Sequence, residues 1–423
     1  MQYVWQHRLW LQQDMRTVDG RRVQVLDPGS LNRGSGPDFF NAKVKIDGRV
    51  WAGDVEIHVK ASDWARHGHD GNRAYDSVIL HVVDRDDAVI HRADGEVIPQ
   101  LRMPCSPDFH LRYKALVDRA DRDLPCAERM RETAPVYLTD WLSTLGYERI
   151  YDKCDRVTGL LERVAGDWES VCYVTVARCL GFGVNGDPFE RLALSVPLPT
   201  VGKHSDDLKA IESLLFGQSG LIETAADDYS AELQREYGYL RHKFGLTAPE
   251  SLNWKMSGMR PGNFPHRRIA LLARLLHGGF RMLSRILDVE SVDDAMRLFA
   301  SDPEGYWCDH YVFGTAAARS AGTMSEASVR GMVINAVVPL QFAYGTVHGR
   351  QDLTDRAVEL LLSLPAERNM VVRMFEAGGI KARDAFTSQA LIQLRRNYCE
   401  RHKCLYCRVG HRMLALDARR VSG

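Results

Sequence analysis

The spacing of hydrophobic residues changes near residue 108, and this change constrains the fold more than any other feature of the sequence. From about residue 20 to 104, apolar and polar residues alternate, and turn signals such as Asp47-Gly48 separate the alternating runs. After residue 108, apolar residues recur at helical spacing between breakers such as Asn185-Gly186 and Gly378-Gly379. The sequence therefore predicts an α+β chain, with an N-terminal mixed β-sheet and flanking helices followed by a large, mostly α-helical domain.

The length of 423 residues supports more than one hydrophobic core, because a single domain commonly has about 100–150 residues. We expect 1–107 to form the sheet domain, 108–383 the helical domain, and 384–423 a C-terminal helix with a cysteine-rich basic segment. Helices are predicted from residue 139 through 150 and near 168–181, 205–216, 227–244, 266–287, 291–300, 325–344, 352–364 and 384–402.

Charge and motif content exclude several classes of function. The 55 Lys and Arg residues balance the 55 Asp and Glu residues, so no overall basic field attracts nucleic acid, and any site for a polyanion must be local. No P-loop and no strand-linked G-x-G-x-x-G motif is present, so no nucleotide cofactor is expected. The first residues lack a signal-peptide pattern, and no apolar run reaches the roughly 18 residues of a membrane span, so we expect a cytoplasmic protein.

The stretch GDVEIHVK, residues 53–60, is the most informative part of the predicted sheet. In an extended strand, alternate side chains share a face, which places Asp54, Glu56, His58 and Lys60 together. Carboxylates suit Mg²⁺ or Mn²⁺, and an imidazole or ammonium group can orient or activate water for phosphodiester cleavage. The alternative is the solvated face of an ordinary half-buried strand.

The partner strand bears on this hypothesis. Pairing across the predicted hairpin turn puts Phe40 opposite Val55 on the apolar face and brings Asp38 beside Glu56. Strict alternation would nevertheless point Asp38 to the other face. We therefore expect either a β-bulge, at Gly53, or an irregular start of the first strand to redirect Asp38.

Pro37-Asp38, followed by Glu56-Ile57-His58 on the second strand of a hairpin, resembles the signature of the PD-(D/E)XK nuclease superfamily. The predicted order of elements over residues 4–104 is also similar to the core of that superfamily. The resemblance implies a metal-dependent nuclease of DNA or RNA, in which Asp38 and Glu56 hold the metal and Asp54 is a further candidate ligand. His58 occupies the position of the usual lysine, with Lys60 one strand step beyond, and either would act on water.

Nearly the whole chain resembles a bacterial family known as domain of unknown function 2851. The matching stretches are SGPDFFNAKVKIDG, WAGDVEIHVKASDW, YDSVILHVV, RPGNFPHRRIALLA, SQALIQLRRNYC and CLYC. This resemblance implies no activity. The alternative to a nuclease is a non-catalytic protein that keeps a nuclease-like sheet and binds nucleic acid or serves as a scaffold.

His67, His69 and Asp70, in RHGHDGN, form a compact polar cluster after the acidic strand. The cluster is similar to the H-x-H-x-D-H zinc motif of metallo-hydrolases, but its spacing is H-x-H-D and no histidine follows. We expect this loop to cap the site and to contact a phosphate through His67 and His69, or to be a solvated turn. His81 lies within an apolar run and is predicted to be a hydrogen-bonded core histidine.

Three of the 9 cysteines lie close together in the sequence, as Cys399-x4-Cys404-x2-Cys407. Thiolates at this spacing suit Zn²⁺ or an iron–sulfur cluster, and the alternative is three thiols packed under a helix end. Candidates for the missing fourth ligand are His402, His411, Cys308 and His310.

Basic residues surround these cysteines, and Arg395, Arg396 and Lys403 are candidates for contact with a phosphate backbone. An ordinary solvated terminus is the alternative.

Overall fold

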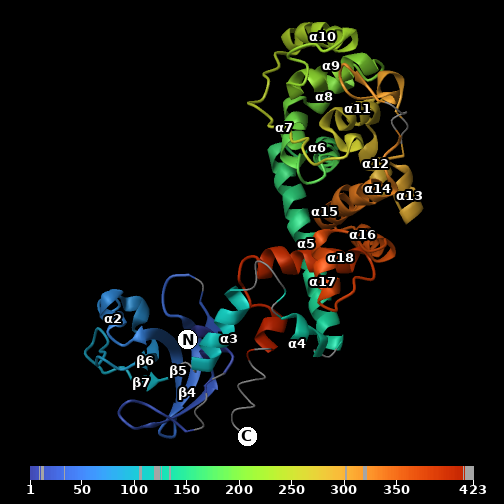
Figure 1. The fold of residues 1–423 in the computed structure, drawn as a ribbon. Helices are drawn as coiled ribbons and strands as arrows, with labels where there is room; N and C mark the ends of the chain where they lie inside the picture. The colour runs from blue at the N-terminus through green and yellow to red at the C-terminus, as the bar shows by residue number, and fades with distance from the viewer. Residues whose placement is uncertain are drawn as a thin grey trace. The chain divides into compact units, whose positions relative to one another are not determined.

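The computed structural model describes residues 1–414 except 9, 11–13, 33, 104–106, 119–123, 125, 133–134, 301–302, 318–321 and 413. The chain divides into two compact units. The first comprises Met1–Trp141, Met374–Ile380 and Leu394–Gly423, and the second comprises Leu142–Arg373 and Lys381–Gln393. The predicted mixed sheet with a large helical region is confirmed (Figure 1).

The sheet in the first unit has the strand order β1-β2-β4-β5-β6-β7, and β3 pairs with β4. It is mixed, because the pairs from β1 to β5 are antiparallel whereas β6 is parallel to both β5 and β7. The strands are β1 Met15–Arg16, β2 Arg22–Asp27, β3 Ser30–Leu31, β4 Phe39–Ile46, β5 Arg49–Lys60, β6 Val78–Arg85 and β7 Gln100–Arg102. Helix α1 (Gln2–Gln6) precedes the sheet, and α2 (Asp63–Arg66) connects β5 to β6.

A β-bulge interrupts the β4–β5 hairpin. Ala42 pairs with Gly53, as the turn predicts, but Phe39 pairs with Val55, so β4 carries one extra residue. Asn41 absorbs the extra residue with a left-handed φ of 56°. The bulge therefore lies on β4, and the prediction of a bulge at Gly53 was wrong.

The bulge exchanges the faces of the residues that precede it. Phe39 is fully buried and Phe40 is exposed, which reverses the predicted apolar face at this end of the strand. One inserted residue has this effect because side chains alternate along a strand. Gly53 serves close packing instead, since a Cβ there would lie 2.4 Å from the Ile79 Cγ2 atom of β6.

Both faces of the central strands are covered. One face packs in a core that includes Val55, Ile57 and Leu80. Against the other face lie Trp64, from α2, and Tyr75, from the 3-10 helix η1 (Arg73–Tyr75). The polar side of β5 is consequently buried, and its interpretation as a solvated face was wrong.

The second unit is helical, as the 3.6-residue period predicts. The predicted helix 266–287 is interrupted, because Gly278 and Gly279 both have positive φ values, and it forms α11 and α12. No helix among the described residues is long and apolar enough to cross a membrane. The helices are α5 Pro135–Arg163, which begins in the first unit, α6 Trp168–Leu180, α7 Gly186–Ser195, α8 Leu198–Gly202, α9 Leu208–Ser219, α10 Asp228–Phe244, α11 Pro265–Leu276, α12 Met282–Leu287, α13 Val292–Arg297, α14 Glu326–Met332, α15 Val338–His348, α16 Gln351–Ser363, α17 Met370–Ala377, which ends in the first unit, and α18 Ala385–Gln393.

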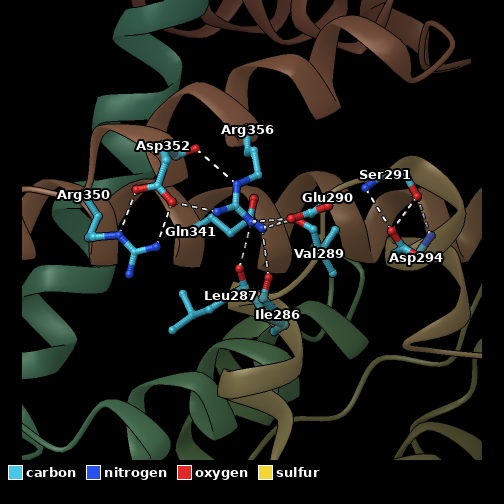
Figure 2. A network of polar contacts seen from close by, with 10 residues as sticks. All are labelled: Ile286, Leu287, Val289, Glu290, Ser291, Asp294, Gln341, Arg350, Asp352 and Arg356. Atoms are coloured by element: carbon cyan, nitrogen blue, oxygen red, sulfur yellow. Dashed lines mark hydrogen bonds and ion pairs between the residues drawn. The ribbon is translucent and has the colours of Figure 1, made fainter.

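A buried glutamine and a half-buried arginine join the end of α12 to α15 and α16 (Figure 2). Gln341 of α15 donates hydrogen bonds of 2.9 Å to the carbonyl oxygens of Ile286 and Val289. Arg356 of α16 donates to the carbonyl oxygen of Leu287 at 3.3 Å. These contacts satisfy backbone acceptors that a helix end leaves without intrahelical partners.

Candidate metal centre

The bulge in β4 brings Asp38 and Glu56 to the same side of the sheet. The backbone N–H of Asp38 donates to Glu56 Oε2 at 2.9 Å, and the N–H of Ile57 donates to Asp38 Oδ2 at 3.1 Å. Gln2, from α1, donates to Asp38 Oδ1 at 2.6 Å. The prediction that an irregularity redirects Asp38 toward Glu56 is confirmed, although its position is Asn41.

Burial and mutual repulsion disfavour two negative charges here. Burial, and after it the charge of the neighbouring Asp38, raises the pKa of Glu56 to about 8. Burial also raises the pKa of Asp38. Without a cation, Glu56 therefore holds a proton at neutral pH, and a bound cation would release that proton.

Two histidines approach Glu56, and a third lies beside one of them. His58, two residues along β5, has its Nε2 atom 3.4 Å from Glu56 Oε1. The Nε2 atom of His69 is also 3.4 Å from Glu56 Oε1, and His67 Nδ1 is 3.1 Å from His58 Nε2. His67 and His69 come from the loop that follows α2, which folds back over β5.

These separations fit a single small cation. A tetrahedral ion with bonds of about 2.0–2.1 Å to nitrogen and oxygen holds neighbouring ligand atoms about 3.4 Å apart. The distances around Glu56 and His58 are 3.1–3.4 Å. The ligand atoms of His58, His67 and His69 all lie within 4.8 Å of one another.

The protonation states also suit metal binding. Burial, and after it the neighbouring His67 and His69, lowers the pKa of His58 to about 4. Burial, followed by the effect of His67, lowers the pKa of His69. Neutral imidazoles carry the free lone pair that a metal requires.

His81 of β6 contacts the Nδ1 side of the His58 ring and so fixes the orientation of that ring. It is fully buried, and its Nε2 atom is 2.9 Å from His58 Nδ1, which leaves His58 Nε2 directed at Glu56. Metal-ligating histidines commonly hold their second ring nitrogen in such a contact. The predicted hydrogen-bonded core histidine is confirmed, and its partner is a site residue.

Tyr75 was not predicted as part of this site. Its ring stacks on His69 with centroids 3.8 Å apart. Burial raises its pKa, and the charges of Glu56 and Asp38 raise it further, so the phenol lies near both carboxylates. Its proximity in sequence to the RHGHDGN stretch was the available signal, but no spacing rule connects it to the acidic strand.

Asp54 and Lys60 were predicted to share a face of the strand with Glu56 and His58, but both lie apart from the group around Glu56. Asp54 Oδ1 accepts the backbone N–H of Asn41 at 3.0 Å, and Oδ2 accepts the Ser77 hydroxyl at 2.6 Å. These hydrogen bonds stabilise the bulge, and they occupy the Asp54 oxygens that could otherwise bind a cation beside Glu56. Lys60 is exposed at the end of β5.

The predicted phosphate contacts of the C-terminal segment differ in exposure. Arg395 is buried and forms an ion pair of 3.2 Å with Glu400, so its charge is already compensated. Arg396 and Lys403 are exposed. The cysteines of this segment belong to the first unit and take no part in the centre around Glu56.

A family profile described as "Protein of unknown function (DUF2851)" matches residues 1–370. The chain belongs to this family. The matched range includes every strand and histidine of the candidate centre and ends before the cysteine-rich segment. No curated protein and no solved structure matched the chain.

Proposed function

We propose that this chain is a metal-dependent nuclease, in which Glu56, His58, His67 and His69 bind one divalent cation. The observation that carries the proposal is the group of His58, His67 and His69, whose ligand atoms all lie within 4.8 Å of one another. Glu56 Oε1 lies 3.4 Å from the Nε2 atoms of His58 and His69, and His67 Nδ1 lies 3.1 Å from His58 Nε2. These three separations are close to the edge of about 3.4 Å in a tetrahedral site.

The ligand types favour Zn²⁺ over Mg²⁺. Mg²⁺ prefers oxygen ligands, whereas imidazole suits transition metals. Of the carboxylates expected to hold Mg²⁺, Glu56 belongs to this ligand set. Asp38 lies beside it, and both Asp54 oxygens accept structural hydrogen bonds.

A bound cation would supply an activated water and offset charge on a phosphoryl oxygen. His67 is the exposed member of the ligand set, so its side of the site is open to substrate and water. Asp38 lies outside the ligand set and next to Glu56, where it would accept the proton of the attacking water. Tyr75 stacks on His69 and would hold the water or a phosphoryl oxygen by donating its phenolic proton.

The arrangement of the sheet supports phosphodiesters as substrates. The order α1, β2, β4, β5, α2, β6, with β6 parallel to β5, agrees with the nuclease-like core implied by the PD-(D/E)XK resemblance. Asp38 and Glu56 are joined across the hairpin, as the resemblance implies for its two metal-binding carboxylates, and the resemblance assigns His58 to the lysine position.

Cleavage of labelled DNA and RNA oligonucleotides, and of a small phosphodiester, tests the proposal with the metal-free protein supplied with Zn²⁺, Mn²⁺ or Mg²⁺. We expect Asp38→Asn to keep its metal and to lose on the order of 10²-fold in rate, as removal of a general base does. Glu96→Gln, a change at an exposed glutamate, is the control. Equal cleavage by Asp38→Asn and the wild type, or binding of nucleic acid without cleavage, would contradict a nuclease with this base.

A further inference from the structure

A pocket in the second unit is lined by three arginines of one helix. Arg267, Arg268 and Arg274 belong to α11, and the other walls include Glu212 of α9 and Trp307 of the 3-10 helix η3 (Gly305–Cys308). The volume of the pocket is about 50 Å³. One water molecule needs roughly 10–15 Å³ of such space, so the pocket has room for a few waters or for one small ion.

Arg268 carries a buried charge that no carboxylate of the described residues compensates. It is 3% exposed, and its Nη2 donates to Asn263 Oδ1, whereas its Nε–H finds no acceptor among the described residues. Its Cζ atom lies 4.6 Å from the centroid of the Phe182 ring, which is an uncharged partner. A buried cation without an anion is costly, so this guanidinium favours an anion in the pocket.

Arg267 adds a second positive charge beside the first. Its Nη1 donates to the carbonyl oxygen of Trp307, and its Nη2 donates to that of Gly322 at 3.0 Å. These acceptors are neutral, so they hold the guanidinium in place without cancelling its charge. Burial, and after it the charge of Arg267, lowers the pKa of Arg268 to about 10, in keeping with two neighbouring cations.

The acidic residues of the pocket already have partners. Glu304 accepts hydrogen bonds from both Nη atoms of Arg274, so these two charges cancel. Glu212 is 1% exposed, and its oxygens accept the indole N–H of Trp307, at 2.9 Å, and the hydroxyl of Tyr229. Burial raises the pKa of Glu212, which favours its uncharged form. The positive charges of Arg267 and Arg268 therefore remain.

We propose that this pocket binds a phosphate group, with Arg267 and Arg268 as its ligands. A guanidinium presents its N–H donors in a fixed fork that matches the oxygens of a phosphate. A doubly charged phosphate would balance both arginines, whereas a single carboxylate would balance one. Both arginines also lie in the first turn of α11, the end of a helix that carries partial positive charge.

The pocket has an open side from which a phosphate can enter. Gly262, just before α11, lines the pocket and is exposed. A free phosphate ion fills a volume of this size, and a phosphate ester would place its phosphate group inside and the rest of the molecule past Gly262. The two kinds of ligand share the contacts to Arg267 and Arg268.

Isothermal titration of the full-length, metal-free protein with inorganic phosphate tests this inference, with sodium chloride at equal ionic strength as the comparison. Removing the metal prevents phosphate from binding at the histidine centre, which belongs to the first unit. We expect one phosphate per chain in the wild type. Arg268→Met should bind phosphate about tenfold more weakly or worse, because it removes one partner of a buried charge pair.

Arg285→Gln, at an exposed arginine of α12, is the control and should bind phosphate as the wild type does. Glycerol phosphate in a second titration distinguishes the sources. Tighter binding than that of inorganic phosphate would support the site with an ester as its ligand, and binding of inorganic phosphate alone would support it with the free ion.

Two further measurements cover the case in which Arg268→Met fails to fold. Arg267→Gln, at a half-buried position, should also weaken phosphate binding. Crystals of the wild type grown with tungstate need no variant, and the anomalous signal should place tungsten beside Arg267 and Arg268. No binding of phosphate beyond the effect of chloride, equal affinity in a folded pocket variant and Arg285→Gln, or tungsten bound only elsewhere would overturn the site.

Discussion

The backbone N–H of Asp38 donates a hydrogen bond to the Glu56 carboxylate across the β4–β5 hairpin, at 2.9 Å. The extra residue in β4 makes this contact possible, because it reverses the face of every residue that precedes it. The same shift buries Phe39 and exposes Phe40. One irregularity thus sets both the hydrophobic face and the acidic end of the candidate centre.

The bulge should therefore control metal affinity as well as stability. Asn41 has a left-handed φ of 56°, which costs a β-branched residue on the order of 1–2 kcal/mol. We expect Asn41→Val to lower the free energy of unfolding by about that amount and to weaken Zn²⁺ binding, and Asn41→Gly to leave both near the wild-type values. Urea unfolding and metal titration measure the two effects. Equal stability and equal Zn²⁺ affinity in Asn41→Val and Asn41→Gly would show that the bulge does not control them.

Asp54 should prove to be a structural residue. Its oxygens accept the Asn41 N–H and the Ser77 hydroxyl, and an asparagine could accept the first bond and donate to the hydroxyl oxygen. Asp54→Asn should accordingly keep full metal content, while Asp54→Ala loses roughly 1–3 kcal/mol of stability. Metal analysis and thermal unfolding separate the roles, and loss of the metal from a folded Asp54→Asn variant would restore Asp54 as a ligand.

The stability of the metal-free protein should depend on pH through Glu56. Its pKa is raised from 4.5 to about 8, so between these values the folded state holds a proton that the unfolded state has released. Stability is thus lost as pH rises through this window, at up to about 1.4 kcal/mol per pH unit. Glu56→Gln removes the effect and should gain stability relative to the wild type from pH 5 to pH 8.

The buried residues His58 and His81 have lowered pKa values, so they have the opposite effect on the pH dependence: the folded protein loses stability as the pH falls toward about 4. Both histidines are present in the wild type and in Glu56→Gln, so their effect cancels in the difference between the two proteins. Unfolding in urea across the pH range provides the comparison, with Glu96→Gln as the control. A difference between Glu56→Gln and the wild type that stays constant with pH would contradict the buried, protonated Glu56.

His81 should tune the metal without binding it. Its Nε2 atom lies 2.9 Å from His58 Nδ1. Loss of such a contact to the second ring nitrogen of a metal-binding histidine typically lowers metal affinity by about 10–100-fold. We expect His81→Ala to weaken Zn²⁺ binding by about that factor with unchanged stoichiometry. His91→Ala, at an exposed histidine, should bind as the wild type does. Complete loss of binding in folded His81→Ala would assign His81 to the ligands.

Local patterns predicted the part of this site that depends on neighbours in sequence. Asp47-Gly48 fixed the pairing of Val44 with Trp51, because a two-residue turn determines the adjacent register. The same pattern failed at Asn41, since nothing in the alternation marks an asparagine that will adopt a left-handed conformation.

The approach of His69 to Glu56 and of His67 to His58 depends on how the connection after β5 folds back over the sheet, which spacing alone does not encode. The helical region was predicted by its period, but the effect of Gly278 and Gly279 on the helix was not.

The metal content of the histidine centre is the most direct test of the account. Zinc titration of the metal-free protein, with X-ray absorption at the zinc edge, reports both stoichiometry and ligand type. We predict one zinc ion with nitrogen and oxygen ligands that is retained in His91→Ala and lost in folded His69→Ala, because His69 Nε2 lies 3.4 Å from Glu56 Oε1. Zinc bound equally by both variants, or bound through sulfur alone, would contradict the proposed centre.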